Sequence, residues 1–368
     1  MTSELGGRKG SSSASPAGSH AAPGASPRQQ MFSLLMGCYA SQCLAVAADL
    51  RIADHLHEAP QRPSDLARDT QCDARAMYRL LRALAGIGVF HERDDGSFEL
   101  TATGELLRSD APGSLQPIAR LIGSDLQWPT LGHLGHTVRT GEPAFEHVFG
   151  MTMWEYLATH ADAHALFHAS MSAFSIAEVR AILDNYDFSD AVTVVDVAGG
   201  QGHLLAAIVD KYPHVEGILF ERPEVTREAR DQFVANGLGH RCQAIAGDMF
   251  STIPSGADCY IMKSVLHDWD DERATQLLRT CRDAMVDRAT LLIITRVVRP
   301  ANEPDLSKFQ DLNMLINLNG AERTADEFRE LLRNADLQLD EIIATPSPLS
   351  ILVCTADTSR QPEPPTSP

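Results

Sequence analysis

The spacing of apolar residues divides the chain into a helical first half and an alternating second half. From about residue 31 to residue 178, apolar positions mostly recur at helical spacing. Beyond residue 190, short apolar runs alternate with amphipathic stretches. The predicted strands are VTVVDV, VEGILFE, CQAIAGD, ADCYIMK and ATLLIIT. Such βα repeats require a parallel sheet with helices on both faces, and ligands bind at the carboxyl ends of its strands.

Residues 1–30 and 357–368 are expected to be disordered tails. The first segment is rich in Gly, Ser, Ala and Pro and lacks apolar periodicity, so it cannot recover the entropy lost on ordering. The apolar run that follows, residues 31–48, invites comparison with a signal peptide or a membrane segment. Polar side chains interrupt it, however, and helical spacing continues to Leu56. We therefore expect a buried amphipathic helix and no membrane partner.

Residues 31–114 have the order of a winged helix. Ser64 is placed to cap a short helix, Asp73 to start a second one, and Asp95 and Gly96 suit a tight turn between two short strands. Many DNA-binding regulators share this order, and the second helix carries three arginines. Acidic residues flank those arginines, so we do not expect a nucleic-acid partner.

Residues 115–178 are predicted to be helical and are rich in large apolar and aromatic side chains. Taken singly, each such side chain is expected in a core, but together they favour one wall of a substrate pocket, with Trp128 as a candidate. Residues 179–356 form the predicted α/β domain, so the chain should fold as two bodies with linking helices between them.

Composition excludes several kinds of partner. An apolar content of 44% in 368 residues is sufficient for two cores. A net charge of −18 opposes both nucleic acid and anionic membranes. The seven cysteines are odd in number and never spaced as CxxC, as expected for reduced core residues of a cytoplasmic protein.

The candidate chemistry begins at the end of the first predicted strand. This strand ends at Asp196 and is followed by a turn containing Gly199, Gly200 and Gly202, which opens a helix. A dinucleotide fingerprint would require a glycine where Leu205 stands, and a P-loop would require a lysine that the turn lacks. The turn therefore predicts a nucleotide-like ligand without phosphates.

Acids also stand at the next two strand ends. Glu221 is placed to accept hydrogen bonds from both hydroxyls of a ribose, and Asp248 could accept one from an adenine amino group. Each acid alone could merely cap a helix. Three acids at successive strand ends, without a phosphate site, favour the adenosine of S-adenosylmethionine.

The chain resembles the plant-type (class I) small-molecule O-methyltransferases that use S-adenosylmethionine, in their bacterial natural-product branch. The resemblance covers about residues 31–355 and rests on FGMTMWEYL, VVDVAGGQG, LFERPEV, GDMF, KSVLHDWDDE and NGAERT. It implies a Rossmann-like cofactor domain and a mostly helical winged-helix domain that forms a homodimer. It also implies transfer of a methyl group to a hydroxyl of an aromatic or polyketide-like acceptor.

The resemblance further implies roles for single residues. His267 falls on the catalytic base, Phe167 and Met171 fall in the substrate pocket, and Ser264 replaces a bulky aromatic beside the base, leaving room for a larger acceptor. Besides the acids and glycines above, the implied cofactor contacts are Ser175, Arg222, Met249 and Lys263. With the acids so assigned, no cluster remains for a metal ion, and none is implied.

One departure from the family lies next to the base. A neutral histidine can take the proton of a phenol, and the family orients it with two glutamates. Glu322 is one of these, whereas Arg296 stands in place of the other and cannot accept the imidazole proton. Arg296 then pairs with Glu322, binds a carboxylate of the substrate or faces the surface. It keeps open a second function, a reaction without methyl transfer such as hydroxylation, decarboxylation or pericyclic rearrangement.

Two further departures concern glycines. Ala198 stands where the family turn begins with glycine, and Asn319 stands before Gly320 where the family has a second glycine. Ala198 is tolerated easily if its φ is negative and is strained if its φ is positive.

Overall fold

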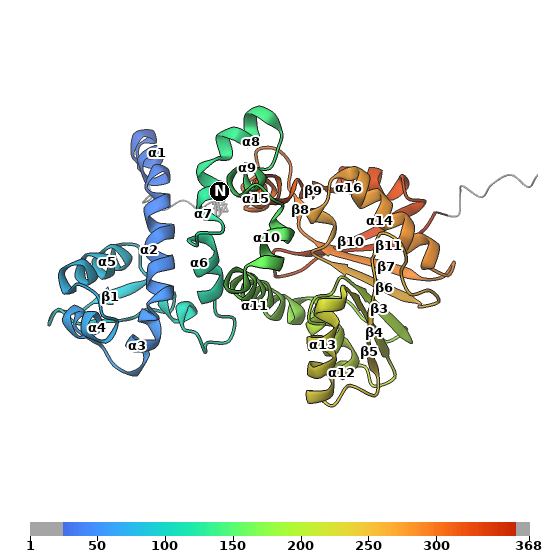
Figure 1. Ribbon diagram of the computed structural model, residues 1–368, viewed down its shortest axis with the longest axis horizontal. Helices are drawn as coiled ribbons and strands as arrows, with labels where there is room; N and C mark the ends of the chain where they lie inside the picture. The colour runs from blue at the N-terminus through green and yellow to red at the C-terminus, as the bar shows by residue number, and fades with distance from the viewer. Residues whose placement is uncertain (1–24, 358–368) are drawn as a thin grey trace, which may run out of the picture.

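The computed structural model describes residues 25–357, except the side chains of residues 176 and 177. It consists of a helical N-terminal part, a set of linking helices and an α/β C-terminal part (Figure 1). The predicted disorder of residues 1–24 and 358–368 lies outside the described residues.

Three helices replace the single one expected near the N-terminus: α1 (Pro27–Leu35), α2 (Gly37–Asp49) and α3 (Ile52–Glu58). The expectation of disorder was wrong for residues 27–30, because Ser26 and Gln29 form a capping box and Pro27 occupies the first helical position. Arg51, with φ of 53°, separates α2 from α3. The expectation of burial was also wrong for α1, which has no buried residue.

The winged-helix order is confirmed by α4 (Pro63–Asp69), α5 (Ala74–Gly86), β1 (Phe90–Glu92) and β2 (Phe98–Leu100). Asp73 caps α5 by accepting a hydrogen bond from the amide of Ala76. Ser64 is not a cap, since α4 begins one residue earlier at Pro63, whose fixed φ suits the first turn. Gly96 has φ of 76°, as the tight turn between the strands requires.

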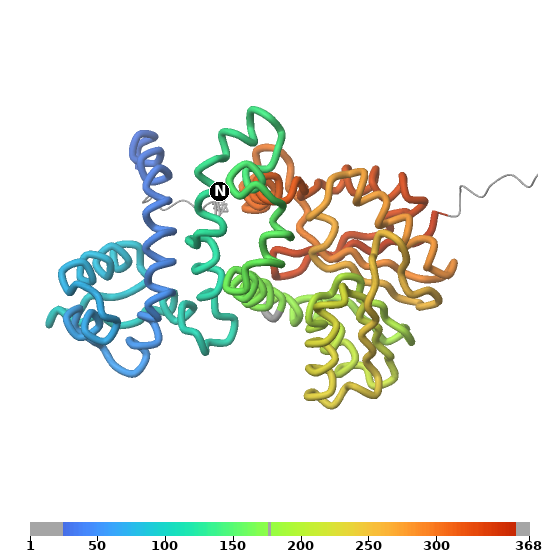
Figure 2. Tube along the Cα trace, viewed as in Figure 1, coloured from blue at the N-terminus to red at the C-terminus, as the bar shows by residue number. Residues whose placement is uncertain are grey.

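The linking segment is helical, as expected. It comprises η1 (Gly104–Leu107), α6 (Gln116–Ile122), α7 (Trp128–Gly132), α8 (Leu134–Thr140), α9 (Ala144–Phe149), α10 (Met153–Thr159) and α11 (Ala161–Asn185). Figure 2 shows α11 running from this segment to the C-terminal part. It contacts both α6 and α12, so it connects the two parts rather than ending near residue 178.

The C-terminal part contains a seven-stranded sheet in the order β10-β11-β7-β6-β3-β4-β5. The five predicted strands are parallel: β3 (Thr193–Val197), β4 (Glu216–Glu221), β5 (Cys242–Ala246), β6 (Cys259–Lys263) and β7 (Thr290–Thr295). The sequence analysis missed β10 (Leu337–Ala344) and β11 (Ser350–Ala356), which pair antiparallel beside β7.

Helices cover both faces of this sheet. One face packs against α14 (Asp271–Ala284) and α16 (Ala325–Arg333), and the other against α11, α12 (His203–Lys211) and α13 (Pro223–Ala235). Beyond the carboxyl end of β7 lie β8 (Val297–Val298), α15 (Ser307–Leu318) and β9 (Arg323–Thr324). The carboxyl ends of the parallel strands therefore meet under α10, α11 and α15, where a ligand can be enclosed.

Four of the seven expected core cysteines are buried, all of them in the C-terminal part. Cys38 on α2 is exposed, which corrects the expectation for that residue.

Candidate active site

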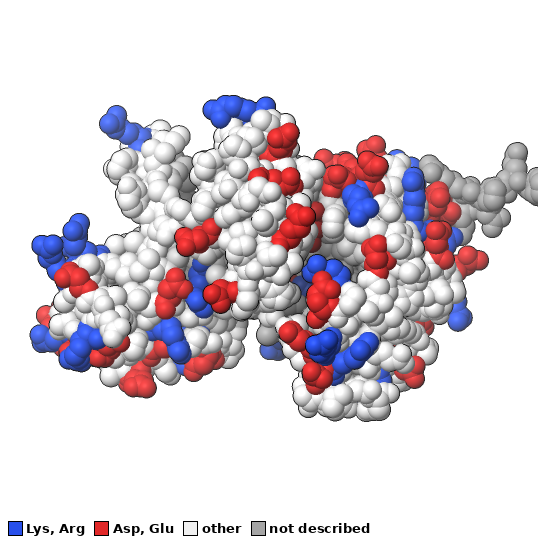
Figure 3. Space-filling model, in the orientation of Figure 1, with Lys and Arg blue, Asp and Glu red and all other residues white. Residues whose placement is uncertain are grey.

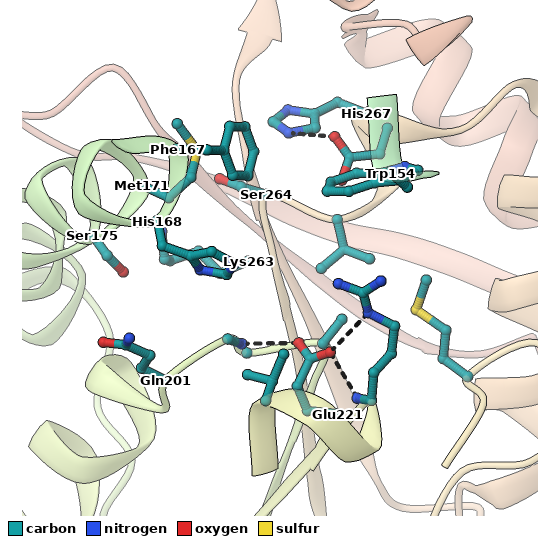
Figure 4. A pocket seen from close by; sticks show the side chains of 18 of the residues that line it. Trp154, Phe167, His168, Met171, Ser175, Gln201, Glu221, Lys263, Ser264 and His267 are labelled. Carbon is teal, nitrogen blue, oxygen red and sulfur yellow. Dashed lines mark hydrogen bonds and ion pairs between the residues drawn. The ribbon is translucent and has the colours of Figure 1, made fainter. Parts of the chain in front are cut away.

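A cavity of about 790 Å³ lies between the linking helices and the strand ends, large enough for two small molecules side by side. Figure 4 shows His267, Ser264 and Phe167 toward one end of it and Glu221 toward the other, with Lys263 between them. Its predicted lining residues are Phe167, Met171, Ser175, Asp196, Gly199, Gly200, Glu221, Arg222, Asp248, Met249, Lys263, Ser264, His267 and Arg296.

Trp128 does not line this cavity, although the sequence analysis placed it in the substrate pocket. It begins α7, and its neighbour Gln127 contributes to the wall instead. The tryptophan of the wall is Trp154, whose ring lies edge-on to Phe167 at 6.0 Å between centroids. Which of the two tryptophans reaches the cavity depends on how the linking helices pack.

The glycine turn after β3 has the left-handed backbone that such a turn requires. Gly200 and Gly202 have φ of 60° and 75°, and Gly202 begins α12 without lining the cavity. A side chain at Gly199 would collide with the carboxylate of Asp196. Ala198 also has a positive φ, 55°, so the strain foreseen for this position is present.

Asp196 is the buried acid beneath this turn. Its Oδ1 is buried without a hydrogen-bond partner among the described residues. Burial raises its pKa to about 7, although the nearby Lys263 ammonium opposes the shift. A ligand that brings a cationic N–H group would satisfy this oxygen, and the α-ammonium of S-adenosylmethionine is such a group.

Glu221 presents its carboxylate at the end of β4. Its two oxygens accept hydrogen bonds from the backbone amides of Gly200 (3.2 Å) and Arg222 (2.8 Å). Burial raises its pKa, and these hydrogen bonds oppose that shift. Each carboxylate oxygen keeps a further lone pair for a ribose hydroxyl.

Asp248, after β5, is held by its own loop. It accepts hydrogen bonds from Ser251 Oγ at 2.7 Å and from the amide of Phe250 at 3.0 Å, which lower its pKa. The side chain is exposed and lines the cofactor end of the cavity, where it remains an ionised acceptor.

Lys263 is bound to a residue that the sequence analysis missed. Its Nζ donates to Glu178 Oε2 at 2.9 Å, and both side chains are largely buried. Glu178 lies on α11, in the middle of a long helix, where no strand end or motif distinguishes it. The pair closes the cavity between its two ends.

His267 lies in η2 (Leu266–Asp268), the short turn after β6. Its Nδ1 is 3.0 Å from Glu322 Oε1, while Glu322 stays behind the ring and does not line the cavity. The backbone carbonyl of His267 accepts the amide of Ala321, and Gly320 approaches this carbonyl too closely for any side chain. Asn319, with φ of 60°, ends α15 in a conformation that asparagine tolerates.

A second carboxylate faces the base from the other side. Asp268 Oδ1 is 3.4 Å from His267 Nε2 and lines the cavity, which the sequence analysis did not foresee although the residue lies inside the HDW motif. Burial lowers the pKa of His267, but the carboxylates of Asp268 and Glu322 outweigh it and leave the pKa above its ordinary value. Burial raises the pKa of Asp268 to about 6.

Arg296 lies between β7 and β8 and lines the cavity. Its Nη1 is 3.8 Å from Glu322 Oε1, and its side chain is 16% exposed. Of the three positions considered from the sequence, the surface position is therefore wrong.

The whole arrangement matches a known family. Residues 131–338 match the model of the O-methyltransferase domain, and residues 32–110 match that of the O-methyltransferase dimerisation domain. The protein belongs to the O-methyltransferase family. This confirms the family, the fold class and the enzyme class expected from the sequence.

Individual relatives agree with this membership. The methyltransferase is 39% identical to the phenazine O-methyltransferase of Lysobacter antibioticus over 88% of its own chain and 94% of that protein. It superimposes on the solved structure of mitomycin 7-O-methyltransferase with a TM-score of 0.83, at 35% identity and with 89% and 97% of the two chains covered.

The cofactor is also established through a solved relative. An O-methyltransferase from neocarzinostatin biosynthesis, in complex with S-adenosylmethionine and 2-hydroxy-5-methyl naphthoic acid, matches with a TM-score of 0.75 at 32% identity, covering 86% of this chain and 96% of that one. The protein is thus an S-adenosylmethionine-dependent O-methyltransferase, as expected. Family members also include an N,N-dimethyltransferase of Streptomyces davaonensis, 33% identical over 80% of this chain and 86% of that protein.

Proposed function

We propose that this methyltransferase methylates a hydroxyl of an aromatic or polyketide-like small molecule, with His267 as the general base. The observation that carries the proposal is the hydrogen bond between His267 Nδ1 and Glu322 Oε1. Since Glu322 occupies Nδ1 from behind, Nε2 remains for the hydroxyl of an acceptor in the cavity.

The bond to Glu322 also sets the protonation of the ring. A carboxylate accepts the Nδ1 proton, so the neutral ring carries its free lone pair on Nε2, the nitrogen toward the cavity. When Nε2 takes the hydroxyl proton, Glu322 stabilises the imidazolium that forms. Proton transfer of this kind contributes about 100-fold to 10,000-fold to a rate.

S-Adenosylmethionine supplies a methyl group that its sulfonium has already activated. We assign Glu221 to the ribose hydroxyls, Asp248 to the adenine and Asp196 to the α-ammonium, because each presents a carboxylate oxygen at the required strand end. Gly199 and Gly200 let the backbone approach the cofactor, and Ser175, Arg222, Met249 and Lys263 complete its walls.

The walls near His267 favour a flat apolar acceptor. The large apolar side chains there are Met153, Trp154, Phe167, Met171, Met314 and Leu318. The short side chain of Ser264 beside the base leaves space for more than one ring. Aromatic acceptors are also named for relatives, such as the phenazine O-methyltransferase.

Methyl transfer is preferred over the reaction without methyl transfer. That alternative depended on Arg296 displacing the carboxylate partner of the base. Arg296 lies 3.8 Å from Glu322, yet Glu322 keeps its hydrogen bond to His267, so the base is still oriented.

We further propose a cytoplasmic homodimer in which residues 31–114 form the contact. Met31, Phe32, Leu34 and Leu35 of α1 are 59–66% exposed, and Figure 3 shows an uncharged surface there. By length and composition alone, Pro27–Asp49 and Ala161–Asn185 could cross a membrane. Ala161–Asn185 instead carries cavity residues and the buried Glu178, and a second copy of the chain would cover α1. Nucleic acid is not a proposed partner.

The test of the proposed reaction is His267→Gln. We expect product carrying one added methyl mass and equimolar S-adenosylhomocysteine from the wild type, and loss of both from the variant. Thermal stabilisation by S-adenosylhomocysteine should remain unchanged, because the base contacts only the acceptor. Wild-type product without a methyl mass, or full activity of His267→Gln, would contradict the proposal.

A further inference from the structure

The guanidinium of Arg296 is a cationic group of the cavity that the proposed proton transfer does not use. Its side chain lines the cavity and is largely buried. Within residues 25–357, its N–H groups form no hydrogen bond. A buried cation whose donors lack acceptors is unfavourable, so the site is suited to an anion that enters the cavity.

Glu322 does not saturate these donors. The 3.8 Å between Arg296 Nη1 and Glu322 Oε1 exceeds hydrogen-bond distance, and the same oxygen already bonds to His267 Nδ1 at 3.0 Å. A guanidinium presents a planar fork of five donors that matches a carboxylate with two parallel hydrogen bonds. Arg296 can therefore bind a second carboxylate while Glu322 continues to orient the base.

The other cations that line the cavity in the described chain already have partners. Lys263 is bound to Glu178 at 2.9 Å. Arg222 lies 3.8 Å from Glu221, at the cofactor end, and stacks over the ring of Trp154. Arg296 is thus the cation next to the base that remains for the acceptor.

We propose that Arg296 binds a carboxylate of the acceptor, which makes the substrate an aromatic hydroxy acid. This inference rests on the proposed methyl transfer at His267. The imidazole and the guanidinium approach the same oxygen of Glu322, at 3.0 Å and 3.8 Å. The carboxylate therefore lies on the ring that carries the reacting hydroxyl or on a ring fused to it.

The test measures binding, so that it does not depend on turnover. Enzyme saturated with S-adenosylhomocysteine is titrated calorimetrically with 1-hydroxy-2-naphthoate, 3-hydroxy-2-naphthoate, 1-naphthol and 2-naphthol. At least one acid should bind the wild type about 10-fold to 100-fold more tightly than its naphthol, as expected for hydrogen bonds to a charged group. Arg296→Gln should abolish this preference without weakening naphthol binding, and Arg296→Lys should keep only part of it.

Arg279→Gln is the matched control, since Arg279 is an exposed arginine bound to the carbonyl of Asn334 and its loss removes the same charge. Acids that bind the wild type no better than naphthols would overturn the inference, as would a loss shared equally by acids and naphthols in Arg296→Gln. Failure of the proposed reaction is a separate outcome: the wild type would then prefer the acids yet form no S-adenosylhomocysteine from S-adenosylmethionine with any acceptor.

Discussion

Oε1 of Glu322 lies 3.0 Å from Nδ1 of His267, and both side chains are buried. The two residues are far apart in the sequence and meet because the loop after α15 folds back onto η2, where Ala321 bonds to the His267 carbonyl. The second oxygen of Glu322 is buried without a partner among the described residues. The carboxylate is therefore committed to the histidine, with Arg296 as its more distant neighbour.

Glu322→Gln should slow methyl transfer while leaving cofactor binding intact. The amide is neutral and stabilises the imidazolium less, so kcat should fall about 10-fold to 100-fold, the size of a hydrogen bond to a charged group. Initial rates at saturating acceptor and S-adenosylhomocysteine affinity provide the comparison. An unchanged kcat would show that Glu322 does not assist the base.

The rate of methyl transfer should rise with pH, because the base must be neutral. Burial lowers the pKa of His267, but Asp268 and Glu322 together raise it above its ordinary value, so the midpoint of the rise should lie above about pH 6.5. Asp268→Asn removes a carboxylate that raises this pKa and should move the midpoint to lower pH. Asp287→Asn removes an equal charge from a fully solvated side chain and should leave the midpoint in place. A midpoint that shifts equally in both variants would assign the effect to net charge.

Asp196→Asn should stabilise the free enzyme at alkaline pH and weaken S-adenosylhomocysteine binding. The folded-state pKa of about 7 lies above the unfolded value, so the acid favours folding least once the pH has risen through 7. The gain from asparagine should grow between about pH 4 and pH 7 and reach on the order of 2 to 4 kcal/mol. Melting curves at pH 5 and pH 8, with and without ligand, measure it. A gain that is equal at both pH values would contradict the assigned pKa.

Ala198→Gly should raise the free energy of unfolding by about 1 kcal/mol, since its φ of 55° is strained for alanine and free for glycine. Ala206→Gly, in the interior of α12, is the matched substitution and should lower it by about 0.5 to 1 kcal/mol. Urea denaturation compares the two. Destabilisation by both substitutions would show that the turn gains nothing from glycine.

Replacing Leu34 and Leu35 together by aspartate should dissociate the homodimer. Both side chains are exposed on α1, where a partner would have to bury the new charges. Light scattering should change from twice the 40.1 kDa chain mass to the mass of one chain. Val234→Asp, on the equally exposed α13, should remain dimeric. Wild-type enzyme that is already monomeric would refute the dimer.

The parallel strands and the acids that end them could be predicted from the sequence. Strands buried on both faces are short apolar runs, and in a parallel sheet their carboxyl ends share one edge, so Asp196, Glu221 and Asp248 had to gather there. His267 was found in the same way, because its motif follows the fourth of these strands.

Only the tertiary structure decided which side chains complete the site. Glu178 against Lys263, Asp268 against His267 and Trp154 in place of Trp128 all depend on how α10 and α11 pack over the strand ends. The antiparallel pair β10 and β11 and the exposure of α1 were missed for a related reason. Apolar spacing shows that a face is to be covered, but the covering partner lies far away in the sequence or in another chain.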